Sequence, residues 1–216
     1  MTPHAIGSPP QPKLFLTPAD HGRALSLDEF LKAGAQEGFR YELIHGRVAV
    51  SPEANMPHHR LCKWLERRLD EYAEQHPEVI NCVLARARFI LALPGDVSAP
   101  EPDLVAYHDF PLDVPCDDVN WPDVNPVLAI EVISEETAAK DLERNPALYL
   151  QIPNLWEYWV IDPRDESHVR PSMVVYRRRG RRWQNPIEVP AGGTYVTRFL
   201  PGFTLALDRR RQRQGP

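Results

Sequence analysis

The clearest helical pattern in the chain spans residues His59 to His76. Hydrophobic side chains recur there at steps of three and four residues, with charged residues between them. This spacing places the hydrophobic side chains on one face of an α-helix. We therefore predict an amphipathic helix that packs one face against a sheet. The recurring residues are Leu61, Trp64, Leu65, Leu69 and Tyr72.

Two shorter helices are also indicated. Ser26 is followed three residues later by Glu29, which is the spacing of a capping box at the start of a helix. Residues Thr137 to Gln151 have a helical pattern that contains Pro146. Because proline has no backbone N–H, we expect Pro146 to interrupt this second helix.

Runs of apolar residues predict the strands of a sheet. Val127 to Ile133 is apolar except for Glu131, as is typical of a central, buried strand. Asp103 to Tyr107 predicts a short strand that follows a proline-rich loop. Val79 to Leu93 suits one or two strands, and Glu157 to Asp162 suits another.

Two hairpins are expected outside these central strands. Residues Tyr41 to Ser51 indicate two strands around a tight turn at His45-Gly46, where glycine can adopt a positive φ. Met173 to Arg178 and Arg182 to Val189 indicate a second hairpin around Gly180. The hairpins therefore lie at the N-terminal and C-terminal sides of the predicted sheet.

The order of these elements predicts an α/β (α+β) fold with a mixed sheet flanked by helices. We expect one domain over residues 19–208, with a long acidic loop from Asp109 to Asn125. Residues 1–18 are rich in Pro, Gly and Ser and are expected to form a flexible leader. Residues 209–216 are expected to form a disordered basic tail.

Composition narrows the class of protein. The chain has 216 residues, of which 43% are hydrophobic, and this is enough for one well-buried domain. The formal net charge of −5 argues weakly against a dedicated nucleic-acid coat, which needs basic residues to neutralise phosphates. A nuclease can still be acidic overall, because a basic patch need cover only one face.

The cysteines and the apolar segments indicate a cytoplasmic protein. The three cysteines, Cys62, Cys82 and Cys116, have no CxxC spacing and predict neither a disulfide framework nor a zinc ribbon. The N-terminal residues lack the apolar core of a signal peptide. No segment has about 18 consecutive apolar residues, so we expect no membrane span.

Two carboxylates are candidates for metal chemistry. A carboxylate is costly to bury without a partner, so Glu131 within its apolar run is expected to face a cavity, a cation or a metal. Asp103 opens the strand that precedes Glu131 in the sequence. Carboxylates at the ends of adjacent strands can share a hard divalent cation such as Mg²⁺. The simpler alternatives are a water-facing or Arg-paired Glu131 and a turn-capping Asp103.

Five motifs in one order resemble the Uma-type putative restriction endonucleases, a bacterial group within the PD-(D/E)XK nuclease superfamily. The resemblance covers roughly residues 26–205 and implies a restriction-endonuclease-like fold. It also implies an enzyme that hydrolyses DNA with Mg²⁺ or Mn²⁺ as its cofactor. The motifs are Tyr41-Glu-Leu-Ile-His-Gly, Ser51-Pro52 followed by His58, Pro102-Asp-Leu-Val, Ile130-Glu-Val-Ile-Ser and Trp156-Glu-Tyr-Trp-Val-Ile-Asp-Pro.

The resemblance assigns roles to four of these residues. Asp103 is the Asp of the Pro-Asp motif and Glu131 is the second acid, so both are expected to be catalytic and to bind the metal. Glu42 is expected to be an accessory acid from the N-terminal hairpin. His58 is expected to contact phosphate or metal, and its alternative is a solvated residue before the helix.

The expected lysine is where this chain departs from the family. The simple motif places a lysine two residues after the second acid, where this chain has Ile133. Relatives carry the lysine on the next helix, between an Asp and a Tyr. Asp141 and Tyr149 fit that pattern, but the lysine position is Asn145. Lys140 and Arg144 lie nearby and could supply a cation, but an arginine is always charged and cannot act as a base. Lys140 is therefore the expected replacement, and it completes the predicted catalytic set.

Two other functions stay open. A catalytically degenerate member would bind nucleic acid or a protein partner without cleavage, and Asn145 favours this alternative. A structural protein would use the acids as ordinary surface groups. The basic segment Arg177 to Trp183 offers charge and a stacking ring for nucleic acid, although a solvated hairpin tip is the favoured interpretation. DNA is the expected substrate, and the chain shows no dimer signature, which leaves a homodimer open.

Overall fold

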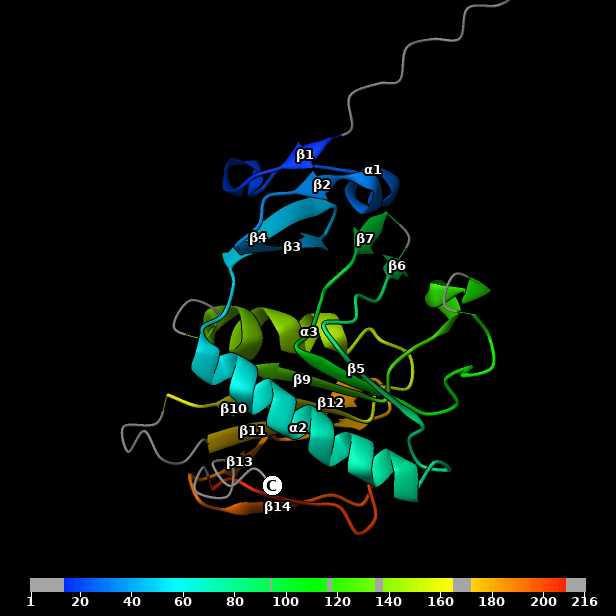
Figure 1. The fold of residues 1–216 in the computed structure, drawn as a ribbon, viewed down its shortest axis with the longest axis vertical. Helices are drawn as coiled ribbons and strands as arrows, with labels where there is room; N and C mark the ends of the chain where they lie inside the picture. Colours follow the sequence, from blue (N-terminus) through cyan, green and yellow to red (C-terminus); the bar gives the residue numbers. More distant parts are fainter. Residues whose placement is uncertain (1–13, 94, 116–117, 135–137, 165–171, 209–216) are drawn as a thin grey trace, which may run out of the picture.

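The computed structural model describes residues 14–93, 95–115, 118–134, 138–164 and 172–208. A mixed sheet forms its centre (Figure 1), and strands β9 and β10 run parallel while their other pairings are antiparallel. This confirms the predicted fold class. In spatial order the strands are β12 (Arg182–Trp183), β11 (Ser172–Arg179), β10 (Glu157–Asp162), β9 (Leu128–Val132), β8 (Leu104–Tyr107) and β5 (Cys82–Ala85), with β13 (Ile187–Val189) also paired to β11.

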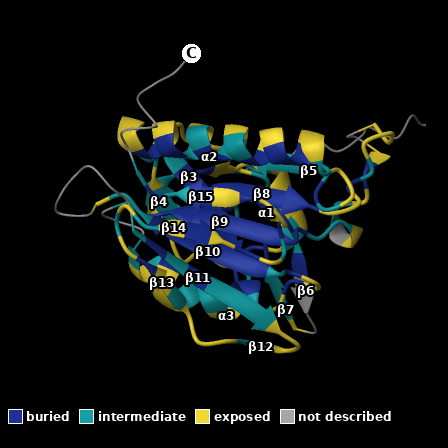
Figure 2. Ribbon diagram, turned by 90° about the horizontal axis from the view of Figure 1, so that it is seen from below, coloured by how far each residue is buried: buried dark blue, intermediate teal, exposed yellow. Residues whose placement is uncertain are grey.

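Helix α2 (Met56–Gln75) covers one face of the sheet. Its apolar side packs against alternate residues of the central strands, and Figure 2 shows its opposite side exposed. The predicted amphipathic helix is therefore confirmed. It begins earlier than predicted, because the Asn55 side chain caps it by accepting the backbone N–H of His58. The small antiparallel pair β14 (Thr194–Val196) and β15 (Thr204–Ala206) contributes to the same core.

The other face is covered by a helix with an unusual turn. A π-helical turn (Lys140–Arg144) leads directly into α3 (Asn145–Tyr149). The sequence predicted a break at Pro146, and this prediction is wrong, because the helical segment continues through Pro146. Proline stands here in the first turn of α3, where its missing N–H costs little. The N–H of Asn145 instead donates to the carbonyl oxygen of Lys140, five residues back. Such π turns are often found at functional sites.

An N-terminal layer lies on the side of α3 away from the central sheet, at the top of Figure 1. Its two main strands form the predicted hairpin, and His45 and Gly46 at the turn both have positive φ, as a two-residue type I′ turn requires. The layer has its own apolar cluster around Leu43. Its elements are β1 (Phe15–Leu16), a 3-10 helix (Pro18–Asp20), α1 (Leu27–Lys32), β2 (Gly34–Ala35), β3 (Phe39–Ile44), β4 (Arg47–Pro52), β6 (Leu91–Leu93) and β7 (Asp96–Ser98).

Residues 14–18, which the sequence predicts as part of a flexible leader, instead belong to the folded N-terminal layer. Phe15 and Leu16 pair in parallel with Gly34 and Ala35, and Leu16 is buried. The reason is that Leu16 joins the apolar cluster of the N-terminal layer. Residues 1–13 and the expected basic tail, residues 209–216, lie outside the described residues.

The remaining short elements agree with the predicted pattern in outline. The capping box at Ser26 and Glu29 is present, and Gly180 turns the C-terminal hairpin with a φ of 63°. The expected loop from Asp109 to Asn125 contains a short 3-10 helix (Trp121–Asp123). Among the described residues, we find no helix of the length and hydrophobicity that a membrane crossing needs.

Candidate active site

Strand pairing brings the two predicted metal ligands to neighbouring positions. Strands β8 and β9 are antiparallel, with Leu104 opposite Ile130. Extending this register by one residue places Asp103 opposite Glu131. Side chains at directly opposite positions start about 5 Å apart. The structure therefore puts both carboxylates at one point of the sheet, and both are buried.

Asp103 is held by three hydrogen-bond donors. Its Oδ1 accepts Arg40 Nη1 at 2.6 Å, and its Oδ2 lies 2.8 Å from the backbone nitrogen of Val132 and 3.0 Å from His58 Nε2. Burial opposes ionisation, but the His58 hydrogen bond and the Arg40 guanidinium hold the pKa of Asp103 well below its usual range. Asp103 is therefore a fixed, ionised carboxylate.

Glu131 has the opposite electrostatic character. Its Oε1 accepts the Tyr149 hydroxyl at 2.6 Å and the side-chain amide of Asn145 at 3.0 Å. Burial raises the pKa of Glu131 well above its ordinary value, and the charges of Asp141 and Asp103 raise it further against the pull of Lys140. A cation beside this carboxyl would favour its ionised form.

Glu42 comes to the same site from β3 of the N-terminal layer. Its Oε1 accepts the backbone N–H of Glu101 at 3.0 Å, while its Oε2 lies 3.3 Å from Lys140 Nζ and 3.2 Å from Arg144 Nη2. Burial would raise the pKa of Glu42, but Lys140 and Arg144 outweigh it and lower the pKa. Glu42 thus anchors the cationic side chains of the π turn.

Lys140 is surrounded by acids. Its Nζ lies 3.3 Å from Glu42 Oε2, 3.8 Å from Asp141 Oδ1 and 4.0 Å from Glu131 Oε1. Burial disfavours the ammonium ion, yet the nearby acids raise the pKa of Lys140 overall. Lys140 is therefore charged, and it connects the N-terminal layer to the central sheet.

Asn145, which stands where the sequence resemblance leads us to expect a lysine, is fully buried. Its Nδ2 donates to Glu131 Oε1 at 3.0 Å and to Asp141 Oδ1 at 3.1 Å. These are the same two oxygen atoms that Lys140 Nζ approaches. The π turn thus brings the Asn145 amide and the Lys140 ammonium to one pair of acids.

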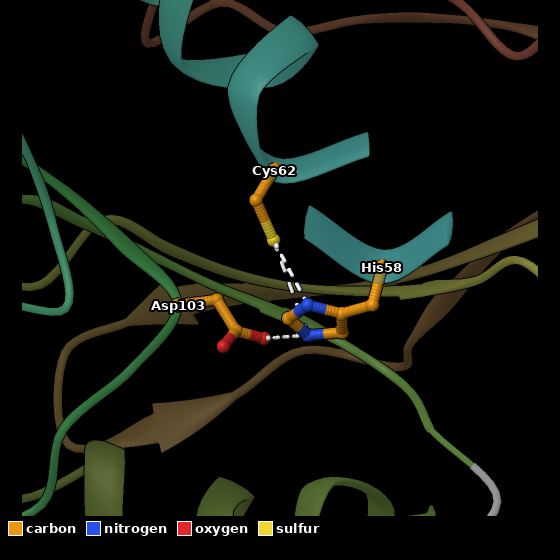
Figure 3. Close-up of side chains that lie close together, drawn as sticks. All are labelled: His58, Cys62 and Asp103. Carbon is orange, nitrogen blue, oxygen red and sulfur yellow. Dashed lines mark hydrogen bonds and ion pairs between the residues drawn. The ribbon is translucent and has the colours of Figure 1, made fainter. Parts of the chain in front are cut away.

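His58 is not a solvated residue before the helix. It lies in the first turn of α2 and is buried, and its ring stands between Asp103 and Cys62 (Figure 3). Cys62 Sγ lies 3.5 Å from His58 Nδ1. A cavity of about 280 Å³ opens beside these three side chains and is also lined by Arg40 and Lys63.

The donor set suits a hard divalent cation. Glu42, Asp103, Glu131 and Asp141 are all buried carboxylates, and Mg²⁺ and Mn²⁺ prefer oxygen ligands. Burial is the main cause that raises the pKa of Glu131, and the charges of Asp141 and Asp103 add to it. A divalent cation beside Glu131 would favour its ionised form, and the side chains of Asp103 and Glu131 offer the oxygen ligands that such an ion prefers.

Sequence reasoning missed several members of the site. Arg40 lies just before the Tyr41 motif, and nothing in the sequence pattern points to its contact with Asp103. The cysteine spacing argues against disulfides and zinc ribbons, and it does not by itself point to Cys62. Its spacing of four residues from His58 was a usable signal, because residues four apart share a helix face.

The basic segment near Gly180 is partly used inside the protein. Arg177 binds the buried carboxylate of Glu157, and Arg178 donates to the carbonyl oxygens of Leu150 and Ile152. The indole N–H of Trp183 donates to the carbonyl oxygen of Pro146 at 2.7 Å. These contacts favour a structural role for the hairpin over a stacking surface for nucleic acid.

Comparisons with known proteins agree with the fold. The crystal structure of a putative nuclease belonging to DUF820 from Anabaena variabilis ATCC 29413 matches with a TM-score of 0.66 and 20% sequence identity, covering 85% of this chain and 95% of that chain. No curated protein matches the sequence. The model of the Uma2 family, described as "Putative restriction endonuclease", matches residues 27–208. The chain belongs to the Uma2 family of putative restriction endonucleases.

Proposed function

We propose that this chain is a metal-dependent endonuclease that hydrolyses DNA phosphodiester bonds. Membership of the Uma2 family of putative restriction endonucleases supports a nuclease function for this chain. The observation that carries the proposal is the position of Lys140. Its ammonium group approaches Glu131 Oε1 and Asp141 Oδ1, the same two oxygen atoms that accept hydrogen bonds from Asn145, which stands at the expected lysine position. The site therefore keeps a lysine beside its acids, although the lysine comes from a different position.

Asp103 and Glu131 are the residues that would hold Mg²⁺ or Mn²⁺, with Glu42 as the accessory acid. When bound, such an ion polarises the scissile phosphate and lowers the pKa of a water molecule. Arg40 and His58 keep Asp103 ionised and fixed in direction. Glu42 orients Lys140, and the Lys140 ammonium supplies positive charge where negative charge develops on the phosphate.

A second candidate is a member that binds DNA without cleaving it. The observation in its favour is Asn145, because an amide carries no charge and here donates its hydrogen bonds to two acids. In this alternative Lys140 would serve only to neutralise buried carboxylates. The two candidates differ in whether any divalent ion allows strand cleavage.

Nicking of supercoiled plasmid in Mg²⁺ or Mn²⁺ tests the proposal, with the natural protein compared with Glu131→Gln. Gln keeps the size of the side chain and removes its charge. We expect the natural protein to nick and the variant to be at least about a hundredfold slower. Glu143→Gln is the matched control, since Glu143 is exposed on the same π turn, and it should nick at the natural rate.

The outcomes separate the candidates. Equal nicking by the natural protein and by folded Glu131→Gln would contradict the proposed site. Binding of a DNA duplex without nicking in either ion would favour the second candidate. Thermal denaturation of each variant verifies that it is folded.

A further inference from the structure

The cluster of His58, Cys62 and Asp103 has a ligand set different from that of the acidic site. It offers an imidazole nitrogen, a thiol sulfur and a carboxylate oxygen, and these ligand atoms all lie within 4.8 Å of one another. Thiolate and imidazole ligands suit Zn²⁺ and other borderline or soft metals, whereas Mg²⁺ prefers oxygen alone. The cluster therefore selects a different class of cation from the four carboxylates.

The distances within the cluster are close to those of a metal site. His58 Nε2 lies 3.0 Å from Asp103 Oδ2 and 3.9 Å from Cys62 Sγ. In a tetrahedral zinc site, bonds of about 2.0–2.3 Å place ligand atoms roughly 3.4–3.6 Å apart. Small side-chain rotations would bring all three atoms to one cation. His58 and Cys62 lie one helical turn apart on α2, which holds them at a fixed spacing.

The surroundings leave room for a cation and for its remaining ligand. The cavity of about 280 Å³ is lined by all three side chains, so water can take the fourth position. Arg40 bonds to the other oxygen of Asp103, Oδ1, and the Val132 N–H donates to Oδ2. Both bonds can stay in place, because a carboxylate oxygen has two lone pairs and the one that faces His58 can bind a metal. We propose that His58 Nε2, Cys62 Sγ and Asp103 Oδ2 form a binding site for Zn²⁺ or a similar thiophilic divalent cation.

A nucleophilic role for Cys62 fits the same side chains less well. Burial raises the pKa of the Cys62 thiol, and the charge of Asp103 raises it further, so the thiolate that would attack a substrate is disfavoured. A coordinated metal supplies the positive charge that ionises a thiol. The case for metal binding rests on the positions of the three ligand atoms and on the cavity beside them.

The site has a consequence for the nuclease, and this consequence rests on the proposed function. Asp103 belongs to both ligand sets, so Zn²⁺ on Oδ2 would compete with its use by Mg²⁺. Zn²⁺ should then inhibit nicking in the natural protein. The binding site itself stands independently of any nuclease activity, since its ligands can be tested without DNA.

Titration of the full chain with Co²⁺, a spectroscopic substitute for Zn²⁺, tests the site. We expect one equivalent of Co²⁺ to give a thiolate-to-cobalt charge-transfer band that Zn²⁺ abolishes by displacement. Cys62→Ser should lose the band and bind Co²⁺ at least about tenfold more weakly, because even loss of an outer-shell partner has that effect. Cys82→Ser, which replaces a cysteine on β5, should keep the band.

A measurement without variants gives the same answer. Under denaturant-free conditions chosen so that Cys62 is alkylated in the metal-free protein, Zn²⁺ should protect Cys62 and leave the extent of Cys82 labelling unchanged, as peptide mass spectrometry would show. Absence of a thiolate band, a band that persists in Cys62→Ser, or equal alkylation of Cys62 with and without Zn²⁺ would each overturn the proposed site. None of these results depends on plasmid nicking, so failure of the zinc site is distinguishable from failure of the nuclease proposal.

Discussion

At the scale of single residues, the site is a group of buried charges that neutralise one another. Arg40 is the side chain on which this balance depends most, since it is buried, bonds to Asp103 and lies in the field of Glu131 and Glu42. The backbone carbonyl of Glu101 accepts its Nη2 at 2.6 Å. Removal of one partner from a buried pair leaves an uncompensated charge. Arg40 is therefore structural as well as electrostatic.

Replacement of Arg40 by Met tests this role. We expect Arg40→Met to lower the free energy of unfolding by about 3–5 kcal/mol, because Asp103 loses its cation while it stays buried. Urea denaturation monitored by circular dichroism measures the change. Arg47→Met is the matched control on the adjacent strand, where the side chain is exposed and bonds to the carbonyl of Gly22, and it should cost less than about 0.5 kcal/mol. Equal stability of the two variants would contradict the account.

At the scale of elements, α2 combines a buried face with a row of acids. Glu66, Asp70 and Glu74 follow one another at steps of four residues, so they lie on one side of the helix. Burial and Asp70 raise the pKa of Glu66, and burial and Glu74 raise the pKa of Asp70. A raised pKa means that these carboxyls stabilise the fold below their ordinary range and that this contribution is lost as pH rises through the folded pKa values.

Asp70→Asn should therefore be more stable than the natural protein at pH 7 and show no such gain at pH 3. We expect a gain of about 0.4–1 kcal/mol from the two like-charge contacts that it removes. Urea denaturation at both pH values measures it. Glu71→Gln, which loses the ion pair to Arg68 at 3.0 Å, should be unchanged or slightly less stable at pH 7. Lower stability of Asp70→Asn at pH 7 would contradict this interpretation.

The elements also show what the sequence could predict. The long helix, the two hairpins and the central strand with Glu131 follow from hydrophobic spacing and turn residues, which are local signals. The π turn does not follow from such signals, because a one-residue change of hydrogen-bond partner leaves no pattern in the sequence. For the same reason the sequence could suggest Lys140 as the catalytic lysine but could not predict that its ammonium group lies beside Glu131. The contact between Arg40 and Asp103 joins residues 63 apart, which periodicity cannot predict.

At the scale of the whole molecule, the candidate site is built where layers meet. The N-terminal layer supplies Glu42, the sheet supplies Asp103 and Glu131, and the π turn supplies Lys140. Within the layer, backbone hydrogen bonds between Leu43 and Ala99 hold β3 beside the end of β7. Leu43 is fully buried in the cluster of that layer. The packing of Leu43 therefore sets the position of Glu42.

Leu43→Ala should lower the free energy of unfolding by about 2–5 kcal/mol, as truncation of a buried leucine does. It should also weaken binding of Mn²⁺, because Glu42 would be less firmly held. Urea denaturation and calorimetric titration with Mn²⁺ measure the two effects. Leu31→Ala on α1, where the side chain is 48% exposed, should change stability by less than about 0.5 kcal/mol. Unchanged stability in Leu43→Ala would contradict the proposed role of this packing.

The central claim is that Lys140 does the work of the lysine that Asn145 replaces, and a lysine swap tests it most directly. Plasmid nicking in Mn²⁺ is compared for the natural protein, Lys140→Met and the double variant Lys140→Met with Asn145→Lys. We predict that Lys140→Met nicks about 10²–10³-fold more slowly and that the second substitution restores at least about a tenth of the natural rate. Natural activity in folded Lys140→Met, or no recovery in a folded double variant, would contradict the claim.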